Sequence, residues 1–179
     1  DNDIIIGARL DDNQQNMYYA IVGHDGTILS DWFSEIGRFE NDVALAIKDN
    51  RGINPKALLN KSGRIISEFY YDISKFNGKL YLAHKKDSDY NSFYCFLDRT
   101  GKKTCEWFND IQPSAGGYSI VKKYSDEPGE LYTMVDPMTG ELGNEWYQKI
   151  GEFTNGIAIA ENVTTTGYGD MGLTCIDLK

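Results

Sequence analysis

A repeated spacing of glycine and aromatic residues is the feature that most constrains this chain. Four glycines are separated by 37, 38 and 39 residues, and they are Gly26, Gly63, Gly101 and Gly140. Two aromatic residues follow six and seven positions after each glycine, namely Trp32-Phe33, Phe69-Tyr70, Trp107-Phe108 and Trp146-Tyr147. An isoleucine follows ten positions after each glycine: Ile36, Ile73, Ile111 and Ile150. A fixed period of this length predicts stacked repeats, in which the glycines and isoleucines have structural roles.

Each repeat has the composition of a β-meander. In the first repeat, residues 17–22 and 27–30 are short β-type runs joined by a turn at Gly26, where glycine supplies a positive φ. The aromatic pair follows, and residues 43–47 form a third apolar run. We expect an all-β fold built as a tandem array of three-stranded antiparallel meanders. Because one such sheet cannot bury both of its faces, neighbouring repeats must stack on each other.

The period divides the chain into a single repeat domain over residues 1–179. We expect a partial repeat at 1–16, repeats at about 17–52, 53–90, 91–129 and 130–169, and a partial repeat at 170–179. Residues 4–10 are predicted to be a third strand without its hairpin, and residues 172–178 a first strand without its turn. The partial repeats at the two ends are compatible with either an open, solenoid-like array or a closed, propeller-like ring. The short period favours the open array. Since the sequence stops where the next turn glycine is due, we expect the chain to be a piece of a longer array.

The charge argues against nucleic acid as a partner. The chain has 18 Lys and Arg against 27 Asp and Glu, a net charge of −9, and its basic residues look scattered. A polyanion would be repelled by that field. No apolar run reaches the ~18 residues of a transmembrane helix, so membrane insertion is not expected. The composition is that of a soluble protein and leaves both the cytoplasm and export open.

Residues suited to catalysis are sparse. There are two histidines and three cysteines, spaced far from the patterns of zinc sites or of nucleophile–histidine pairs. Cys95 and Cys105 lie on two arms of one predicted hairpin and could form a disulfide, but buried thiols are favoured. The string that begins at Asp87 resembles an EF-hand loop, yet Ser92 stands where glycine is required. We therefore predict no catalytic residue, no metal and no cofactor.

Aromatic residues are the first group of candidates for binding. One residue of each aromatic pair is expected to fill the core, and core packing of both is favoured. If the first residue is instead exposed, Trp32, Phe69, Trp107 and Trp146 would form a row able to contact a peptide or a sugar.

The loops between repeats are the second group of candidates. They vary in length and composition, and in repeat proteins such loops often gather on a binding face. Two of them are acidic and would favour a basic partner; their candidate residues are Asp87, Asp89, Asp126 and Glu127.

The repeat resembles the bacterial WG repeat, also called the KWG repeat, over nearly the whole chain. Residues 96–101, Phe-Leu-Asp-Arg-Thr-Gly, match its strand and turn, and residues 153–159, Phe-Thr-Asn-Gly-Ile-Ala-Ile, match its last part. The Trp-Gly dipeptide of the family is absent from every first strand, and Lys149 replaces an acidic residue. The resemblance implies a scaffold without general catalytic residues. We expect a non-enzymatic module that binds another protein; the alternatives are a carbohydrate- or peptide-binding module and a structural subunit of a larger assembly.

Overall fold

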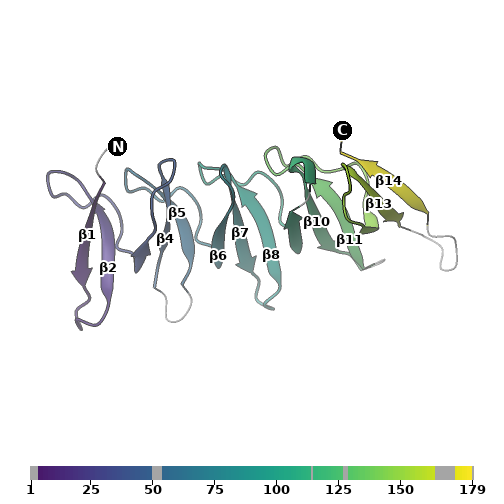
Figure 1. The fold of residues 1–179 in the computed structure, drawn as a ribbon. Coiled ribbons are helices and arrows are strands. Elements are labelled where there is room, and N and C mark those ends of the chain that lie inside the picture. The colour runs from purple at the N-terminus through teal and green to yellow at the C-terminus, as the bar shows by residue number, and fades with distance from the viewer. Residues whose placement is uncertain (1–3, 50–53, 114, 127–128, 164–171, 179) are drawn as a thin grey trace. The chain divides into compact units, whose positions relative to one another are not determined.

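The computed structural model describes residues 4–49, 54–113, 115–126, 129–163 and 172–178 (Figure 1). Within these residues the secondary structure is all-β and antiparallel, apart from the short 3₁₀ helix η1 (Ala115–Gly117). The strands are β1 (Ile5–Leu10), β2 (Met17–Val22), β3 (Glu35–Ile36), β4 (Val43–Ile47), β5 (Lys56–Asn60), β6 (Asp72–Asn77), β7 (Leu80–Lys86), β8 (Ser92–Leu97), β9 (Asp110–Pro113), β10 (Ser119–Tyr124), β11 (Glu130–Val135), β12 (Tyr147–Ile150), β13 (Ile157–Asn162) and β14 (Leu173–Asp177).

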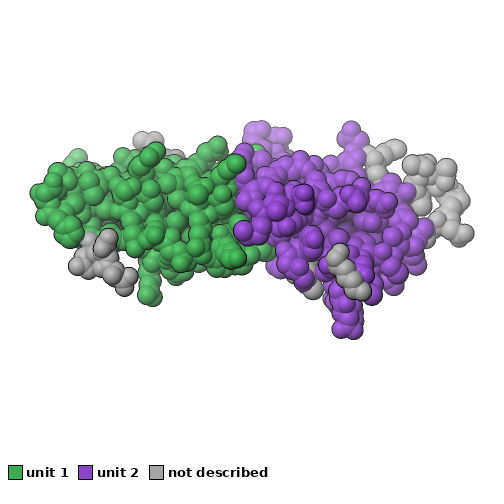
Figure 2. Space-filling model, turned by 90° about the horizontal axis from the view of Figure 1, so that it is seen from above, with its two compact units in different colours: residues 1–85, 97–102 green, residues 86–96, 103–179 purple. Residues whose placement is uncertain are grey.

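The chain forms two compact units, coloured separately in Figure 2. Unit 1 comprises residues 1–85 and 97–102, and unit 2 comprises residues 86–96 and 103–179. The predicted repeat boundaries do not coincide with this division, because residues 91–129 contribute to both units. Each unit is described by itself below.

Unit 1 contains small antiparallel sheets with continuous registers. β1 pairs with β2 from Ile5↔Val22 to Leu10↔Met17, and β4 lies between β3 and β5 in a second sheet. β6 pairs with β7 with an irregularity between Lys75 and Asn77. The β1–β2 pairing confirms the strand that the sequence predicts within residues 4–10.

The turns after β5 and β8 are built by the same arrangement of hydrogen bonds. In the turn after β8, the Asp98 carboxylate accepts hydrogen bonds from the backbone amides of Thr100 and Lys102 and from the Thr100 hydroxyl, at 2.8, 3.0 and 2.6 Å. Asn60 accepts the equivalent bonds after β5. Side chains of this kind stabilise tight turns locally, and the glycine that follows adopts a positive φ, +80° at Gly101.

Three of these glycines also allow close packing. A Cβ on Gly101 would lie 1.9 Å from the carbonyl oxygen of Ile66, and one on Gly140 would lie 1.9 Å from that of Thr104. A Cβ on Gly63 would lie 2.3 Å from the carbonyl oxygen of Leu29, whereas Gly26 has no such neighbour within 4 Å. At Gly63, Gly101 and Gly140, glycine is therefore required by the close approach of a backbone carbonyl as well as by the positive φ.

The segment after each turn differs from its prediction. Residues 27–30 do not form a regular strand; Ile28 makes one isolated bridge to Val22, and Ile65 and Leu142 make the matching bridges to Leu59 and Val135. Residues 27–30 do not continue the ladder because the Ser30 side chain takes the place of a backbone partner: its hydroxyl accepts the hydrogen bond from the Ile21 amide at 2.9 Å. The sheets also cross the predicted repeat boundary, since β4, in the segment predicted as the first repeat, pairs with β5, in the segment predicted as the second.

The core of unit 1 lies between its sheets. Phe33 is fully buried and packs in one cluster with Ile21, Ala46 and Leu59, while Ile4, Ile36, Phe39 and Ile65 pack around it. Ile4 and Ile21 belong to the β1–β2 side, and Ala46 and Leu59 belong to β4 and β5. The second aromatic of the pair thus fills the space between successive sheets.

Unit 2 carries a six-stranded antiparallel sheet in the order β14-β13-β12-β11-β10-β9. β13 pairs with β14 from Ile157↔Asp177 to Glu161↔Leu173, which confirms the strand that the sequence predicts within residues 172–178. Of the predicted structural isoleucines, Ile73 and Ile111 are buried, and Ile36 and Ile150 are half-buried. Among the described residues there is no helix with the length and hydropathy needed to cross a membrane.

Candidate functional site

The two aromatic residues of each pair lie in different environments. The second residue is buried at Phe33, Tyr70 and Phe108 and half-buried at Tyr147. The first residue stays partly accessible: Trp32, Trp107 and Trp146 are half-buried, and Phe69 is 38% exposed. The two positions are neighbours in extended backbone, where successive side chains point to opposite faces. Only the second can therefore enter the core, and the favoured prediction that both residues pack there is not what the structure shows.

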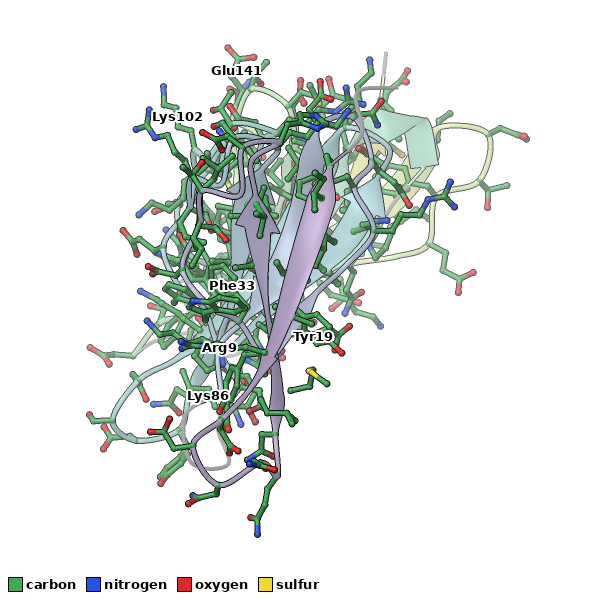
Figure 3. All side chains as sticks on the ribbon, turned by 90° about the vertical axis from the view of Figure 1, so that its left-hand side faces the viewer. Arg9, Tyr19, Phe33, Lys86, Lys102 and Glu141 are labelled. Carbon is green, nitrogen blue, oxygen red and sulfur yellow. The ribbon has the colours of Figure 1, made fainter. Side chains whose placement is uncertain are left out.

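A cation covers each of the first aromatics. The Arg9 guanidinium lies 4.4 Å from the centre of the Trp32 ring, and the Lys48 ammonium lies 5.5 Å from that of Phe69. In unit 2 the ammonium of Lys103 lies 5.7 Å from the ring of Trp107, and that of Lys123 lies 5.3 Å from the ring of Trp146. These distances are within the range of cation–π attraction. We name these four pairs the aromatic–cation pairs; Figure 3 labels Arg9, which lies on β1.

Three of the four cations come from one recurring position. Lys48 and Lys123 each stand 22 residues after a turn glycine, as does Lys85, whereas Asn162 takes this place after Gly140. Arg9 stands at the corresponding register position of β1, since β1 and β4 pair in equivalent registers. Lys103 is the exception, because it stands two residues after Gly101 and four before Trp107. The expectation of scattered basic residues is therefore incomplete, and the offset of 22 is the signal that would have revealed Lys48 and Lys123.

A hollow accompanies the first aromatic–cation pair. A surface cavity of about 350 Å³ is lined by Arg9, Leu10, Asp11, Asp12, Tyr18 and Trp32. The Tyr18 hydroxyl donates a hydrogen bond of 3.3 Å to Asp49, and desolvation followed by the charge of Asp49 raises the pKa of Tyr18. Asp11 is already engaged, because its carboxylate accepts hydrogen bonds from the Gln15 amide and the Asn16 side chain. The hollow thus presents an aromatic surface, a cation and the carboxylate of Asp12.

The acidic candidate residues differ in how available their carboxylates are to a partner. Asp87, Asp89 and Asp126 are exposed, and Glu127 lies outside the described residues. The Asp87 carboxylate accepts hydrogen bonds from the amides of Asp89 and Asn91, both at 2.9 Å, and from the Asn91 side chain at 3.0 Å. Asp87 therefore organises its own loop, and Asp89 and Asp126 are the better candidates for contact with a partner.

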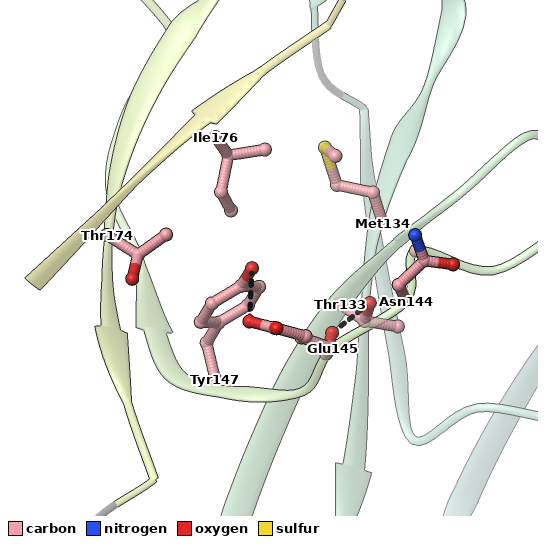
Figure 4. A pocket seen from close by; sticks show the side chains of 8 residues that line it. Thr133, Met134, Asn144, Glu145, Tyr147, Thr174 and Ile176 are labelled. Carbon is pink, nitrogen blue, oxygen red and sulfur yellow. Dashed lines mark hydrogen bonds between the residues drawn. The ribbon is translucent and has the colours of Figure 1, made fainter.

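A second cavity opens beside Tyr147 in unit 2 (Figure 4). It has a volume of about 380 Å³ and is lined by Thr133, Met134, Gly143, Asn144, Glu145, Tyr147, Thr174 and Ile176. Tyr147 donates a hydrogen bond of 3.3 Å to Glu145, and the Thr133 hydroxyl donates to the Glu145 carbonyl at 2.7 Å. Desolvation, followed by the charge of Glu145, raises the pKa of Tyr147. The space exists because Tyr147 does not enter the core as Phe33 does.

The described residues include no group of three or more His, Cys, Asp and Glu side chains that could hold a metal ion. His24 is exposed in a turn, and the ring of His84 lies 5.0 Å from that of Tyr71 in an edge contact. The three cysteines are free thiols. Cys105 accepts a hydrogen bond from the Phe96 amide at 3.4 Å, and burial raises the pKa of its thiol.

Comparisons with known proteins give little further information. No protein-family model matches the chain, and no curated protein matches it. The crystal structure of the uncharacterized protein lmo1340 from Listeria monocytogenes EGD-e is similar to it, with a TM-score of 0.38 and 14% sequence identity. The similarity covers 79% of this chain and 49% of that protein. A likeness of this extent assigns neither a family nor a function.

Proposed function

We propose that this chain is a non-enzymatic scaffold of divergent WG-type β-repeats that binds another protein through its aromatic–cation pairs. The observation that carries the proposal is the recurrence of a partly exposed aromatic ring beneath a cation at Trp32, Trp107 and Trp146. The ring of each pair stands six residues after a turn glycine, and the described residues include no group of His, Cys, Asp and Glu side chains that could hold a metal ion.

The chemistry of the pairs suits a protein partner. Tryptophan, tyrosine and arginine are the residues that most often dominate the energy of protein interfaces, because they bury large areas with few lost rotamers. A cation already held on a ring face loses less freedom when it meets a carboxylate. We therefore propose a partner surface that combines carboxylates with apolar side chains. The exposed carboxylates of Asp89 and Asp126 provide a second, weaker contact for a partner with basic residues.

The test is capture of proteins from the source organism at low and high salt, followed by titration of the purified partner. We expect one stoichiometric partner, and we expect the double change Trp32→Ala and Trp146→Ala to weaken binding at least about tenfold, or 1.4 kcal/mol. Arg9→Gln with Lys123→Gln removes the charges and leaves the rings. Tyr90→Asn is the control, since Tyr90 is an 81% exposed aromatic outside the row.

Two results would contradict the proposal. Equal binding by the tryptophan variants and the Tyr90→Asn control would exclude the aromatic–cation pairs. If only the double variant Asp89→Asn and Asp126→Asn lost binding, the acidic loops, and not the aromatic–cation pairs, would be the binding site.

Carbohydrate binding is the second candidate, favoured by the cavity of about 380 Å³ beside Tyr147. Its wall combines a partly exposed tyrosine with Asn144, Glu145 and Thr174, and sugar recognition uses an aromatic surface with nearby polar groups of this kind. Trp146 is adjacent in sequence, so a panel of soluble glycans should change its fluorescence. A response abolished by Tyr147→Ala, with binding of protein partners unaffected, would support this candidate over the first.

A further inference from the structure

Two cysteines of unit 2 stand opposite each other, one in β8 and one on the segment that returns along it. The Thr104 amide donates a hydrogen bond of 3.0 Å to the Phe96 carbonyl, which pairs the two arms of this hairpin. Cys95 and Cys105 come one residue further along each arm, and both belong to unit 2. Cα atoms opposite each other in an antiparallel pair are about 4.5–5.5 Å apart, and disulfides bridge Cα atoms about 4.4–6.8 Å apart. The pairing therefore brings the two cysteines within the range of a disulfide.

The Cys105 sulfur lies between the two arms, where it accepts the hydrogen bond from the Phe96 amide at 3.4 Å. The Phe96 nitrogen is bonded to the carbonyl carbon of Cys95, so bond lengths alone keep this sulfur within about 6 Å of the Cys95 Cα. The next bridge joins Tyr94 to Phe108, so Cys105 begins a bulge of residues opposite Cys95. A bulge leaves its residues outside the regular ladder, which gives the Cys105 side chain freedom to turn toward Cys95.

The other repeats show that side chains at these two positions are directed at one backbone carbonyl. The hydroxyl of Ser30, which corresponds to Cys105, donates a hydrogen bond of 2.8 Å to the carbonyl of the residue that follows it. The hydroxyl of Thr133, which corresponds to Cys95, donates a hydrogen bond of 2.7 Å to the carbonyl of Glu145. Both carbonyls belong to the residue that stands two positions before the second aromatic of a pair. In the third repeat both positions carry cysteine, so two thiols converge on one point.

We propose that Cys95 and Cys105 form an intramolecular disulfide bond when the chain meets a small disulfide of the glutathione class. The structure shows both thiols in their reduced form. Cys95 is 0% exposed and Cys105 is half-buried, so the oxidant reaches Cys105 and not Cys95. This difference assigns the two residues different roles in the exchange reaction.

The exchange takes place in two attacks. The Cys105 thiol loses its proton, and its sulfur attacks the small disulfide, which expels one small thiol and leaves a mixed disulfide. The Cys95 thiol then loses its proton and attacks the Cys105 sulfur, which expels the second small thiol. The two thiols of the chain lose two protons and two electrons, and the small disulfide takes them up to become two thiols.

The bond would join β8 to the segment that leads to Trp107. It replaces the hydrogen bond between the Cys105 sulfur and the Phe96 amide, and it closes a short loop around the turn at Gly101. A closed loop restricts the unfolded chain, so the oxidised chain should be more stable than the reduced one. The inference does not depend on the proposed function, because it requires no partner.

Oxidation of the purified chain in a Cys175→Ser background tests the proposal, since Cys175 is exposed and would otherwise react. The chain is treated with oxidised glutathione in the folded state and, separately, is refolded from urea in the presence of oxidised glutathione. A digest without reductant should contain the peptide of Cys95 joined to that of Cys105, as mass spectrometry detects. The melting temperature should rise by about 5 °C on oxidation and return on reduction. In the folded chain the reaction should accelerate with pH, because burial raises the pKa of the Cys105 thiol and the thiolate is the attacking form.

The other repeats supply matched control variants. Cys105→Ser introduces the residue found at Ser30, and Cys95→Thr introduces the residue found at Thr133, so both variants should fold. Neither should show the joined peptides or the rise in melting temperature. Cys95→Thr should stop after the first attack and keep one glutathione on Cys105.

Two results would overturn the proposal. One is a chain in which alkylation still labels both thiols after refolding with oxidised glutathione. The other is a chain with both cysteines that retains glutathione on Cys105 while Cys95 stays free, because the second attack would then not occur. A disulfide that forms during refolding but not in the folded chain would support the proposal, since refolding removes the limit on access to the thiols.

Discussion

Replacing the aromatic residue seven positions after a turn glycine should cost much more stability at Phe33 than at Tyr147. Phe33 is 0% exposed and packs against Ile21, Ala46 and Leu59. Phe33→Ala would leave a cavity whose walls belong to strands held by continuous hydrogen bonds, so the site cannot collapse. We expect a loss of about 3–5 kcal/mol in the free energy of unfolding. The backbone bridge between Phe33 and Tyr19, with N–O distances of 2.7 and 2.8 Å, does not depend on the side chain.

Tyr147 is the matched comparison, because it occupies the same offset after Gly140. Its side chain is half-buried at the edge of an existing cavity, and its hydroxyl bond to Glu145 is exposed. Tyr147→Ala would enlarge a space that water already reaches, and we expect a loss of about 1 kcal/mol.

Urea unfolding measures both losses, followed by circular dichroism and by the fluorescence of the neighbouring Trp32 and Trp146. Phe33→Leu keeps an apolar side chain of similar reach and should recover about half of the loss, which provides a folded variant if Phe33→Ala does not fold. Equal losses for Phe33→Ala and Tyr147→Ala would refute the assignment of the core between the sheets of unit 1.

Two further perturbations test the turns and the surface charges. Gly26→Ala should cost about 1–2 kcal/mol through its positive φ alone, whereas Gly101→Ala should cost more, because its Cβ would also meet the Ile66 carbonyl; melting temperatures of the two variants measure the difference. The Tyr132 hydroxyl, followed by Lys122, holds the pKa of Glu130 below its ordinary value, so its stabilising effect is present above the ordinary glutamate pKa and is lost as the pH falls through the folded value. Glu130→Gln should make the melting temperature less sensitive to acid than that of the unchanged chain, and identical acid profiles would contradict this assignment.

Part of the fold could be predicted from local sequence signals. The turn glycines and the Asp or Asn residues before them define tight turns through bonds that span only a few residues. The alternating apolar runs predict the strands, including those near both ends of the chain. The sheets themselves were less predictable, because the ladder position after each turn is filled by the side chain of Ser30 or Ser67 rather than by a continuous strand.

The candidate site was likewise only partly predictable from the sequence. The tryptophans could be found from their spacing, but the sequence alone did not decide which aromatic of each pair is buried. The cations at Trp32, Phe69 and Trp146 lie 21 to 23 residues earlier in the chain, so their role follows from the tertiary packing, whereas Lys103 lies four residues before Trp107. The sequence shows Lys48, Lys85 and Lys123 at a constant offset from the turn glycines. Only the tertiary structure shows that Lys48 lies over the Phe69 ring and Lys123 over the Trp146 ring.

The sequence by itself determined the period, the turns and the all-β character, because these depend on backbone φ angles and on hydrogen bonds between near neighbours. Only the tertiary structure decided that Phe33 enters the core while Trp32 stays at the surface beneath Arg9. The physical reason is that burial depends on which sheet lies against a given face, and a residue's own repeat does not contain that information.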